Sequence, residues 1–215
     1  MELTPKIDKH LQEAGYANHC FISWPHTLNQ DLTDCAKKLK ESIVQGLALS
    51  IENPYVFLDE SDVIGGDKWE RIISDSLCRS IVLIALCAPI YYHSKWCGLE
   101  WTTMQKLNEK RIPKKKFGAI IPIIIRYSPG DLPDPVKEIQ YYDMSPILTS
   151  GRSYYESEEY RQNIRKIIIR IQEVAWTLFE NNIKANCEDF QISQESVFSY
   201  YHEKKQPMPF RKDTK

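Results

Sequence analysis

The sequence predicts an α/β fold in which a parallel, five-stranded sheet carries helices on both faces. One observation is the continuous apolar run 80–87, whose many β-branched residues are typical of a strand buried on both faces. A second is that such runs alternate with stripes of helical spacing, as in strand–helix–strand units. The clearest stripe consists of Leu32, Cys35, Ala36, Leu39, Ile43 and Leu47.

The expected strands are short and cover residues 19–24, 54–58, 80–87, 118–125 and 139–143. Pro25 ends the first strand, because proline cannot continue a central strand. Pro122 lies inside the fourth, which indicates a bulge or a position near the sheet edge.

The expected helices lie between these strands. A short one falls near 7–14 and another spans 31–47, and three later stripes complete the pattern. These stripes are Trp69, Ile72, Ile73, Ser76, Leu77 and Ser80; Cys97, Trp101, Met104 and Leu107; and Tyr160, Ile164, Ile167, Ile168, Ile171, Ala175 and Leu178. Right-handed crossovers then favour a flavodoxin-like sheet of order 2-1-3-4-5. We expect an N-terminal extension (1–16), one domain (17–182) and a partly flexible C-terminal extension (183–215).

Composition narrows the class of protein. The formal net charge of −1 argues against a nucleic-acid binder, which is normally basic. The N-terminus has no apolar signal region, and the longest apolar run, 81–90, is too short to cross a membrane. The six cysteines form no C-x-x-C pair and show no metal-ligand spacing. We therefore expect a cytoplasmic protein with mostly buried, reduced thiols, no metal, and no nucleic-acid or membrane partner.

Ligands of open parallel sheets bind beyond the carboxyl ends of the strands, which here selects residues 23–29, 59–69, 88–96 and 126–131. No G-x-G-x-x-G follows the first strand, so a dinucleotide-binding dehydrogenase is unsupported. P-loop and nucleophile-elbow motifs do not occur either. A phosphate-accepting receiver domain would need acidic residues after the first and third strands, which instead end in Ser-Trp-Pro and Cys-Ala-Pro.

Glu100 is the candidate for chemistry in the stretch 94–101. A carboxylate in the first turn of a helix usually serves the helix dipole. Glu100, however, shares a helix face with Met104 and Leu107, so we expect it at the edge of a cleft, where it can stabilise positive charge. Three aromatic residues that follow strands or begin helices favour a pocket for flat rings: Trp24, Trp69 and Trp96.

Three motifs resemble those of the Toll/interleukin receptor (TIR) family. Residues 21–24, Phe-Ile-Ser-Trp, are similar to the first TIR motif. Residues 57–69 resemble its second strand, "BB" loop and following helix, although Gly66 stands where receptor-type members often have Pro-Gly. Residues 94–100 match the S-x-W-C-x-x-E signature of catalytic TIR domains. The resemblance covers about residues 17–180.

The resemblance implies an enzyme that cleaves the nicotinamide–ribose bond of NAD, with Glu100 as the catalytic residue. NAD would be the substrate, and no cofactor is implied. The residues expected to line or close the site are Phe21, Ser23, Trp24, Asp59, Trp69 and Trp96. The chain also resembles the stand-alone TIR subunit of Thoeris anti-phage systems. That likeness implies a phage-derived trigger, self-association on activation, and an ADP-ribose-derived messenger, linear or cyclic, for a separate effector protein.

Two other functions remain open from the sequence. In a non-catalytic TIR scaffold that signals by assembly, Glu100 would only be a carboxylate at a helix start. A nucleoside 2-deoxyribosyltransferase-like enzyme would share the sheet and a catalytic glutamate, but it would act on deoxynucleosides and ignore NAD.

Overall fold

The computed structural model of the chain describes residues 2–26, 30–58, 67–112, 118–127, 132–188 and 190–199. Within them, five parallel strands form one sheet in the order β2-β1-β3-β4-β5, which confirms the predicted fold class. The strands are β1 (Asn18–Ser23), β2 (Val56–Leu58), β3 (Ser80–Cys87), β4 (Ile120–Ile124) and β5 (Tyr142–Asp143).

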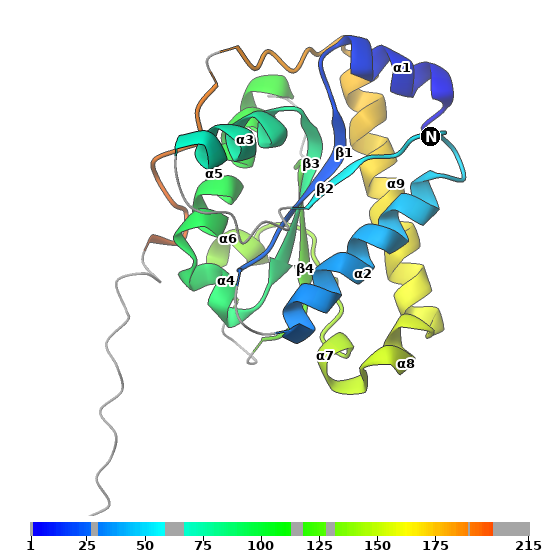
Figure 1. The fold of residues 1–215 in the computed structure, drawn as a ribbon, viewed down its shortest axis with the longest axis vertical. Helices are drawn as coiled ribbons and strands as arrows, with labels where there is room; N and C mark the ends of the chain where they lie inside the picture. Colours follow the sequence, from blue (N-terminus) through cyan, green and yellow to red (C-terminus); the bar gives the residue numbers. More distant parts are fainter. Residues whose placement is uncertain are drawn as a thin grey trace, which may run out of the picture.

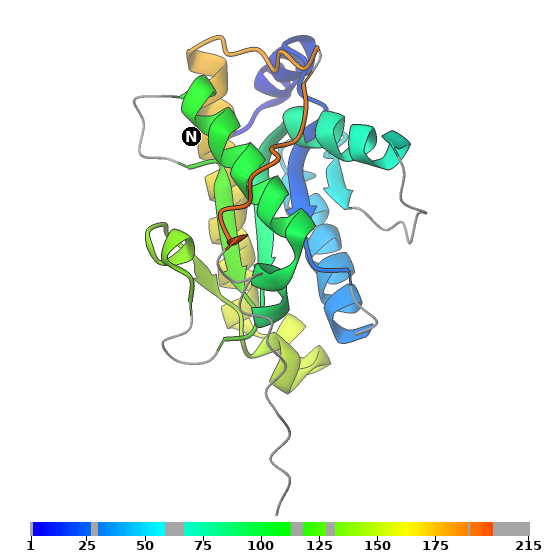
Figure 2. The ribbon, with the colours of Figure 1, turned by 90° about the vertical axis from the view of Figure 1, so that its left-hand side faces the viewer.

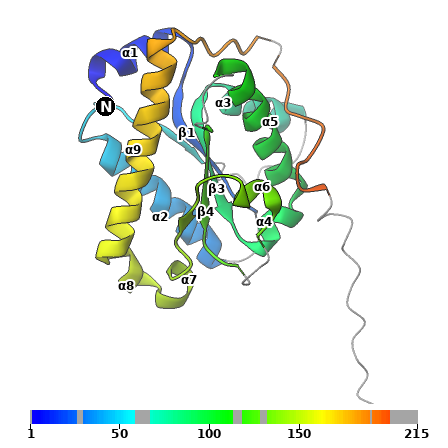
Figure 3. The same cartoon turned by 180° about the vertical axis from the view of Figure 1, so that it is seen from behind.

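Helices cover both faces of this sheet (Figures 1 and 3). One side carries α1 (Pro5–Glu13), α2 (Gln30–Leu47) and α9 (Glu158–Glu180). The other carries α3 (Asp67–Cys78), α4 (Pro89–His93), α5 (Lys95–Arg111) and α6 (Asp134–Lys137), while α7 (Ile147–Ser150) and α8 (Arg152–Tyr155) precede α9. None of the helices in the described ranges has both the length and the apolar character needed to cross a membrane.

The core follows from the apolar runs that the sequence displays. All eight residues of β3 are buried, as expected for the central strand of a sheet covered on both faces. The predicted stripe of α2 is also fully buried, and α2 packs against α9. Pro122 of β4 pairs with Ala85 of β3, but on the other side β5 reaches only Ile123 and Ile124. The missing N–H of Pro122 is therefore tolerated close to the sheet edge, as predicted.

Some predicted boundaries were wrong. The fifth strand begins at Tyr142 rather than at residue 139, and α6, α4, α7 and α8 were not expected. Proline explains two of these short helices: α4 and α6 each have a proline at their first or second position, where its fixed φ favours a helix start. Ile72 was also misassigned to the buried stripe of α3, since it is 56% exposed while Ile73 is completely buried.

The expectation of reduced thiols fails at two cysteines. Cys78 at the end of α3 and Cys187 form a disulfide across 109 residues. No local spacing pattern predicts a pair so far apart in the sequence. The other cysteines are free and buried, as expected: Cys20, Cys35, Cys87 and Cys97.

The chain after α9 forms a segment that we call the C-terminal strap, residues 183–188 and 190–199. It leaves the end of α9, crosses to the other side of the sheet and runs between α3 and α5 (Figure 2). Backbone N–H groups of Ser193 and Val197 donate to the Oγ1 atoms of Thr103 and Thr102, at 2.8 and 2.9 Å. Residues expected to be a partly flexible tail therefore include a segment that is hydrogen-bonded to α5.

Arg111, at the end of α5, joins three parts of this side of the molecule. It is 9% exposed, and its guanidinium donates hydrogen bonds to the backbone carbonyls of Cys78, Ser80 and Ala185. It also lies 5.0 Å from the centre of the Tyr16 ring. Burial, its largest influence, lowers the pKa of Arg111, but the usual value is so high that the group stays charged.

Arg111→Met should lower the free energy of unfolding by about 2–4 kcal/mol, because three carbonyls lose charged donors in a buried place. Urea denaturation at pH 7 measures the change. Lys110→Met, an exposed neighbour on the same helix, serves as the control and should change stability by less than about 0.5 kcal/mol. Equal midpoints for the two variants would contradict this role for Arg111.

Candidate functional site

Glu100 lies in the second turn of α5 and points into the protein. Ser94 is the N-cap of this helix, and its Oγ accepts a hydrogen bond from the backbone N–H of Cys97 at 3.3 Å. The helix therefore begins at Lys95, and Glu100 is its sixth residue. The interpretation of Glu100 as a first-turn carboxylate that serves the helix dipole was wrong. Only 6% of the residue is exposed, so its side chain is not turned into bulk water.

Ser23, the last residue of β1, holds the Glu100 carboxylate. Its Oγ donates a hydrogen bond to Glu100 Oε2 at 2.5 Å, and it lies 2.9 Å from the hydroxyl of Tyr91. A serine hydroxyl has one proton. Since Ser23 gives that proton to Glu100, the Tyr91 hydroxyl must be the donor to Ser23. The result is a directed chain from Tyr91 through Ser23 to the carboxylate, in which each hydrogen bond polarises the next.

Tyr91 was missed by the sequence analysis. It lies on α4, directly after the central strand, where Ala88 is extended and Pro89 starts the helix. Its side chain is completely buried. The segment 88–96 had been selected as one of the loops beyond the strand ends, but nothing in it distinguished Tyr91 from its neighbour Tyr92. The proline at the start of a short helix was the usable signal, because its fixed φ favours a helix directly after the strand.

The buried surroundings hold the neighbouring groups in their neutral forms. Burial raises the pKa of the Tyr91 hydroxyl well above 10.0, and the negative charge of Glu100 contributes to the rise. Burial, followed by the Glu100 charge, likewise raises the pKa of the Cys97 thiol well above 9.0. Tyr91 therefore remains a proton donor at neutral pH. Cys97 remains a thiol rather than a thiolate, which makes it a poor nucleophile.

The other predicted site residues take part in separate contacts. Phe21 is 1% exposed and stacks on Phe57 at 5.0 Å between ring centres. Trp24 is 9% exposed and stacks on His26 at 4.6 Å. The half-buried rings of Trp69 and Trp96 meet edge to face at 4.3 Å, which joins the start of α3 to the start of α5. Asp59 lies outside the described residues, as does the adjoining loop up to residue 66.

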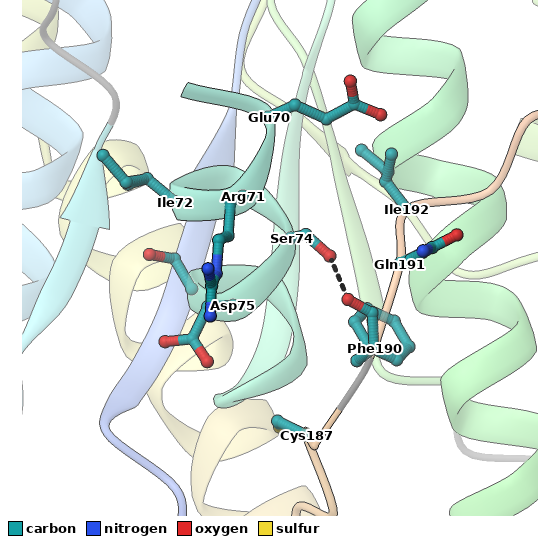
Figure 4. A pocket seen from close by; sticks show the side chains of 10 residues that line it. Glu70, Arg71, Ile72, Ser74, Asp75, Cys187, Phe190, Gln191 and Ile192 are labelled. Carbon is teal, nitrogen blue, oxygen red and sulfur yellow. Dashed lines mark hydrogen bonds between the residues drawn. The ribbon is translucent and has the colours of Figure 1, made fainter. Parts of the chain in front are cut away.

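A pocket lies elsewhere, between α3 and the C-terminal strap (Figure 4). Across it, Ser74 Oγ donates a hydrogen bond to the backbone carbonyl of Phe190 at 3.0 Å. Its lining includes charged and apolar side chains but none of the predicted site residues: Glu70, Arg71, Ile72, Ser74, Asp75, Ser76, Cys187, Phe190, Gln191 and Ile192. We assign no chemistry to it.

The arrangement around Glu100 suits the stabilisation of positive charge. Its carboxylate lies at the carboxyl edge of a parallel sheet, where such folds bind ligands. A carboxylate in a poorly solvated place interacts more strongly with a nearby cation than one in water does. Over the described ranges, no group of three or more His, Cys, Asp or Glu side chains is placed to hold a metal ion.

The profile of one sequence family, described as the TIR domain, matches residues 21–164 of this chain. The matched range begins in β1 and ends inside α9, so it includes the last part of β1 and all of β2 to β5, as well as Ser23, Tyr91 and Glu100. No curated protein sequence matches the chain.

Proposed function

Because this chain belongs to the TIR domain family, we propose that it is an enzyme that cleaves the nicotinamide–ribose bond of NAD. Glu100 is the catalytic residue of this proposal. The observation that carries it is the buried hydrogen bond between Ser23 and Glu100. It aims a carboxylate at the carboxyl edge of the sheet with a fixed orientation, and a carboxylate that only served the helix dipole would need no such support.

The reaction requires little acid catalysis. The bond between C1′ of the ribose and the nicotinamide nitrogen breaks, and both of its electrons go to nitrogen. The positively charged ring thereby leaves as neutral nicotinamide, without needing a proton. Positive charge then develops on the ribose, as in glycoside hydrolysis. Glu100 stabilises this charge by accepting hydrogen bonds from the ribose hydroxyls next to the broken bond.

Ser23 and Tyr91 prepare the carboxylate for this role. Tyr91 donates to Ser23 and Ser23 donates to Glu100 Oε2, so this oxygen of the carboxylate is held in place. A carboxylate that is already oriented loses little energy to reorganisation when charge develops. The side chains of Phe21, Trp24, Trp69 and Trp96, together with Asp59, complete the proposed substrate site.

The acceptor of the ribosyl group decides the product. Attack by water gives ADP-ribose and releases one proton. Attack by a group of the same molecule gives a cyclic isomer. We propose that the product is a messenger in anti-phage defence, made by a stand-alone cytoplasmic TIR protein of the Thoeris type. In that role the chain would self-associate when a phage-derived trigger appears, and its product would act on a separate effector protein.

The purified full chain, incubated with NAD, is expected to release nicotinamide and an ADP-ribose-derived product in equal amounts. Liquid chromatography with mass spectrometry measures both. The assay is run with the purified protein by itself and again with lysate from phage-infected cells, which would supply a trigger. Absence of nicotinamide under both conditions, from protein shown to be folded, would overturn the proposal.

Ser23→Ala is expected to lower the rate of nicotinamide release by about 10–100-fold, because one charge-assisted hydrogen bond contributes about 1.5–3 kcal/mol. The control is Ser42→Ala, which removes a similar serine–tyrosine contact, Ser42 Oγ to the Tyr160 hydroxyl at 2.9 Å, between α2 and α9. It should lose stability but keep the rate per folded molecule. Equal rates for the two variants would show that Ser23 does not prepare Glu100.

A further inference from the structure

The last described turn of the C-terminal strap ends in a buried aromatic residue. Phe198 is completely buried, and its ring lies against three aromatic rings of α4 and α5. The distances between ring centres are 6.1 Å to Tyr91, 5.3 Å to Tyr92 and 5.4 Å to Trp101. The contacts with Tyr91 and Trp101 have the edge-to-face geometry that aromatic pairs favour. Phe198 thus packs against the tyrosine whose hydroxyl begins the hydrogen-bond chain to Glu100.

Contacts hold the C-terminal strap in place along its described length. Phe198 is therefore kept in position by these contacts as well as by the packing of its own ring. The disulfide from Cys187 to Cys78 fixes its first part on α3. Farther along, Lys106 contacts Glu195 at 3.1 Å, and Val197 is hydrogen-bonded to Thr102 at 2.9 Å. These contacts bring the strap along α5 from the end of that helix to its beginning, where Glu100 lies.

Gly98 gives the strap room to approach α5. A Cβ at this position would lie 1.9 Å from Ser196 Oγ, which is closer than atoms can pack, and 3.0 Å from Ser196 Cβ, which is a tight contact. Ser196 Oγ also accepts a hydrogen bond from the backbone N–H of Phe198 at 3.1 Å, so moving it away would disturb Phe198. Glycine inside a helix is unfavourable relative to alanine. Its presence one turn from the helix start is explained by the strap that crosses there.

We propose that Phe198 is a positioning residue for the NAD-cleaving site, and that the C-terminal strap therefore contributes to the activity of this enzyme. The ring of Phe198 packs edge to face against Tyr91, the Tyr91 hydroxyl donates to Ser23, and Ser23 orients Glu100. The activity part of this inference rests on the proposed function. The packing part, which says that Phe198 keeps α4 and the start of α5 in place, does not depend on the proposed function.

Hydrogen exchange, followed by mass spectrometry or NMR on the full chain, tests the packing part without any enzyme assay. The informative amides are Tyr91, Ser94 and Gly98, which donate to the carbonyls of Ala88, Tyr91 and Ser94. In Phe198→Ala they should exchange at least ten times faster than in the wild type, while amides in the middle of α9 stay unchanged. The control, Phe190→Ala, removes another ring from the same strap and should leave the three amides protected.

Kinetics test the positioning part. Phe198→Ala should lower kcat for nicotinamide release at least tenfold and change KM by less than twofold, because misalignment of the carboxylate weakens its stabilisation of the transition state more than it weakens substrate binding. Phe198→Leu fills most of the space and should recover most of kcat. A loss that merely reflected unfolding would instead follow the folded fraction and would be absent well below the melting temperature.

A compensating pair keeps the test valid if Phe198→Ala does not fold. Gly98→Ala should raise the exchange of the same amides, although alanine favours a helix. Ser196→Gly in the same chain should reverse part of that rise, because it removes the colliding atoms together with the acceptor of the Phe198 N–H. No effect of Gly98→Ala, together with unchanged exchange in a Phe198→Ala chain that folds, would overturn the proposal. If the wild type releases no nicotinamide, the proposed function fails, and the exchange results still decide whether Phe198 supports this region.

Discussion

Glu100→Gln is expected to reduce nicotinamide release from NAD by at least about 100-fold, which is the usual effect of removing one group that stabilises charge in a transition state. Glutamine has the same shape as glutamate and can still accept the hydrogen bond from Ser23. It carries no charge to offset the positive charge on the ribose. The expected signature is a fall in kcat with little change in KM, measured by nicotinamide release at pH 7.

A matched control is Glu109→Gln, an exposed residue on the same helix, which should keep the wild-type rate. Thermal unfolding of both variants then separates loss of charge from loss of fold. The scaffold alternative predicts that Glu100→Gln retains its biological output. A Glu100→Gln chain that is folded and as active as Glu109→Gln would remove Glu100 from the mechanism.

Cys187→Ser should lower the free energy of unfolding by about 2–5 kcal/mol when no reductant is present. The disulfide to Cys78 closes a segment of 109 residues, and closing a long loop removes much of the conformational freedom of the unfolded chain. Urea denaturation at pH 7 measures the difference. Of the six cysteines, four should react with a thiol reagent in the unfolded, unreduced wild type.

Reductant provides the internal control for this prediction. With dithiothreitol present, the wild type should lose the same stability and unfold at nearly the same urea concentration as Cys187→Ser. If the two proteins already unfold together without reductant, or if all six cysteines of the wild type react, the disulfide makes no contribution in solution.

The strands and the long helices could be predicted because each carries its own pattern. The run 80–87 and the stripes of α2 and α9 are local signals, and the strand order follows from right-handed crossovers. The short helices were missed because a single helical turn has no period to detect. Ile72 was misassigned because one residue can satisfy a spacing rule and still point outward.

Only part of the candidate site could be predicted from the sequence. Ser23 and Glu100 each belong to a recognisable motif, and the parallel sheet brings both motifs to one edge. Tyr91 belongs to no motif, and its hydroxyl gains a role only from the way α4 turns over the strand end. Phe198 lies in the C-terminal extension that was expected to be partly flexible; its partners lie about a hundred positions earlier in the sequence, and no local pattern joins the two.

The cystine bridge also makes a covalent ring that contains the helix with Glu100, all of β3 to β5, and α9. A protease that cuts the backbone once inside this ring would leave two fragments still tied together. Such a nicked molecule would run as one band on a denaturing gel without reductant and as two bands with it. The helix with Glu100 would then stay attached to the rest of the protein after a cut that would separate an unbridged chain.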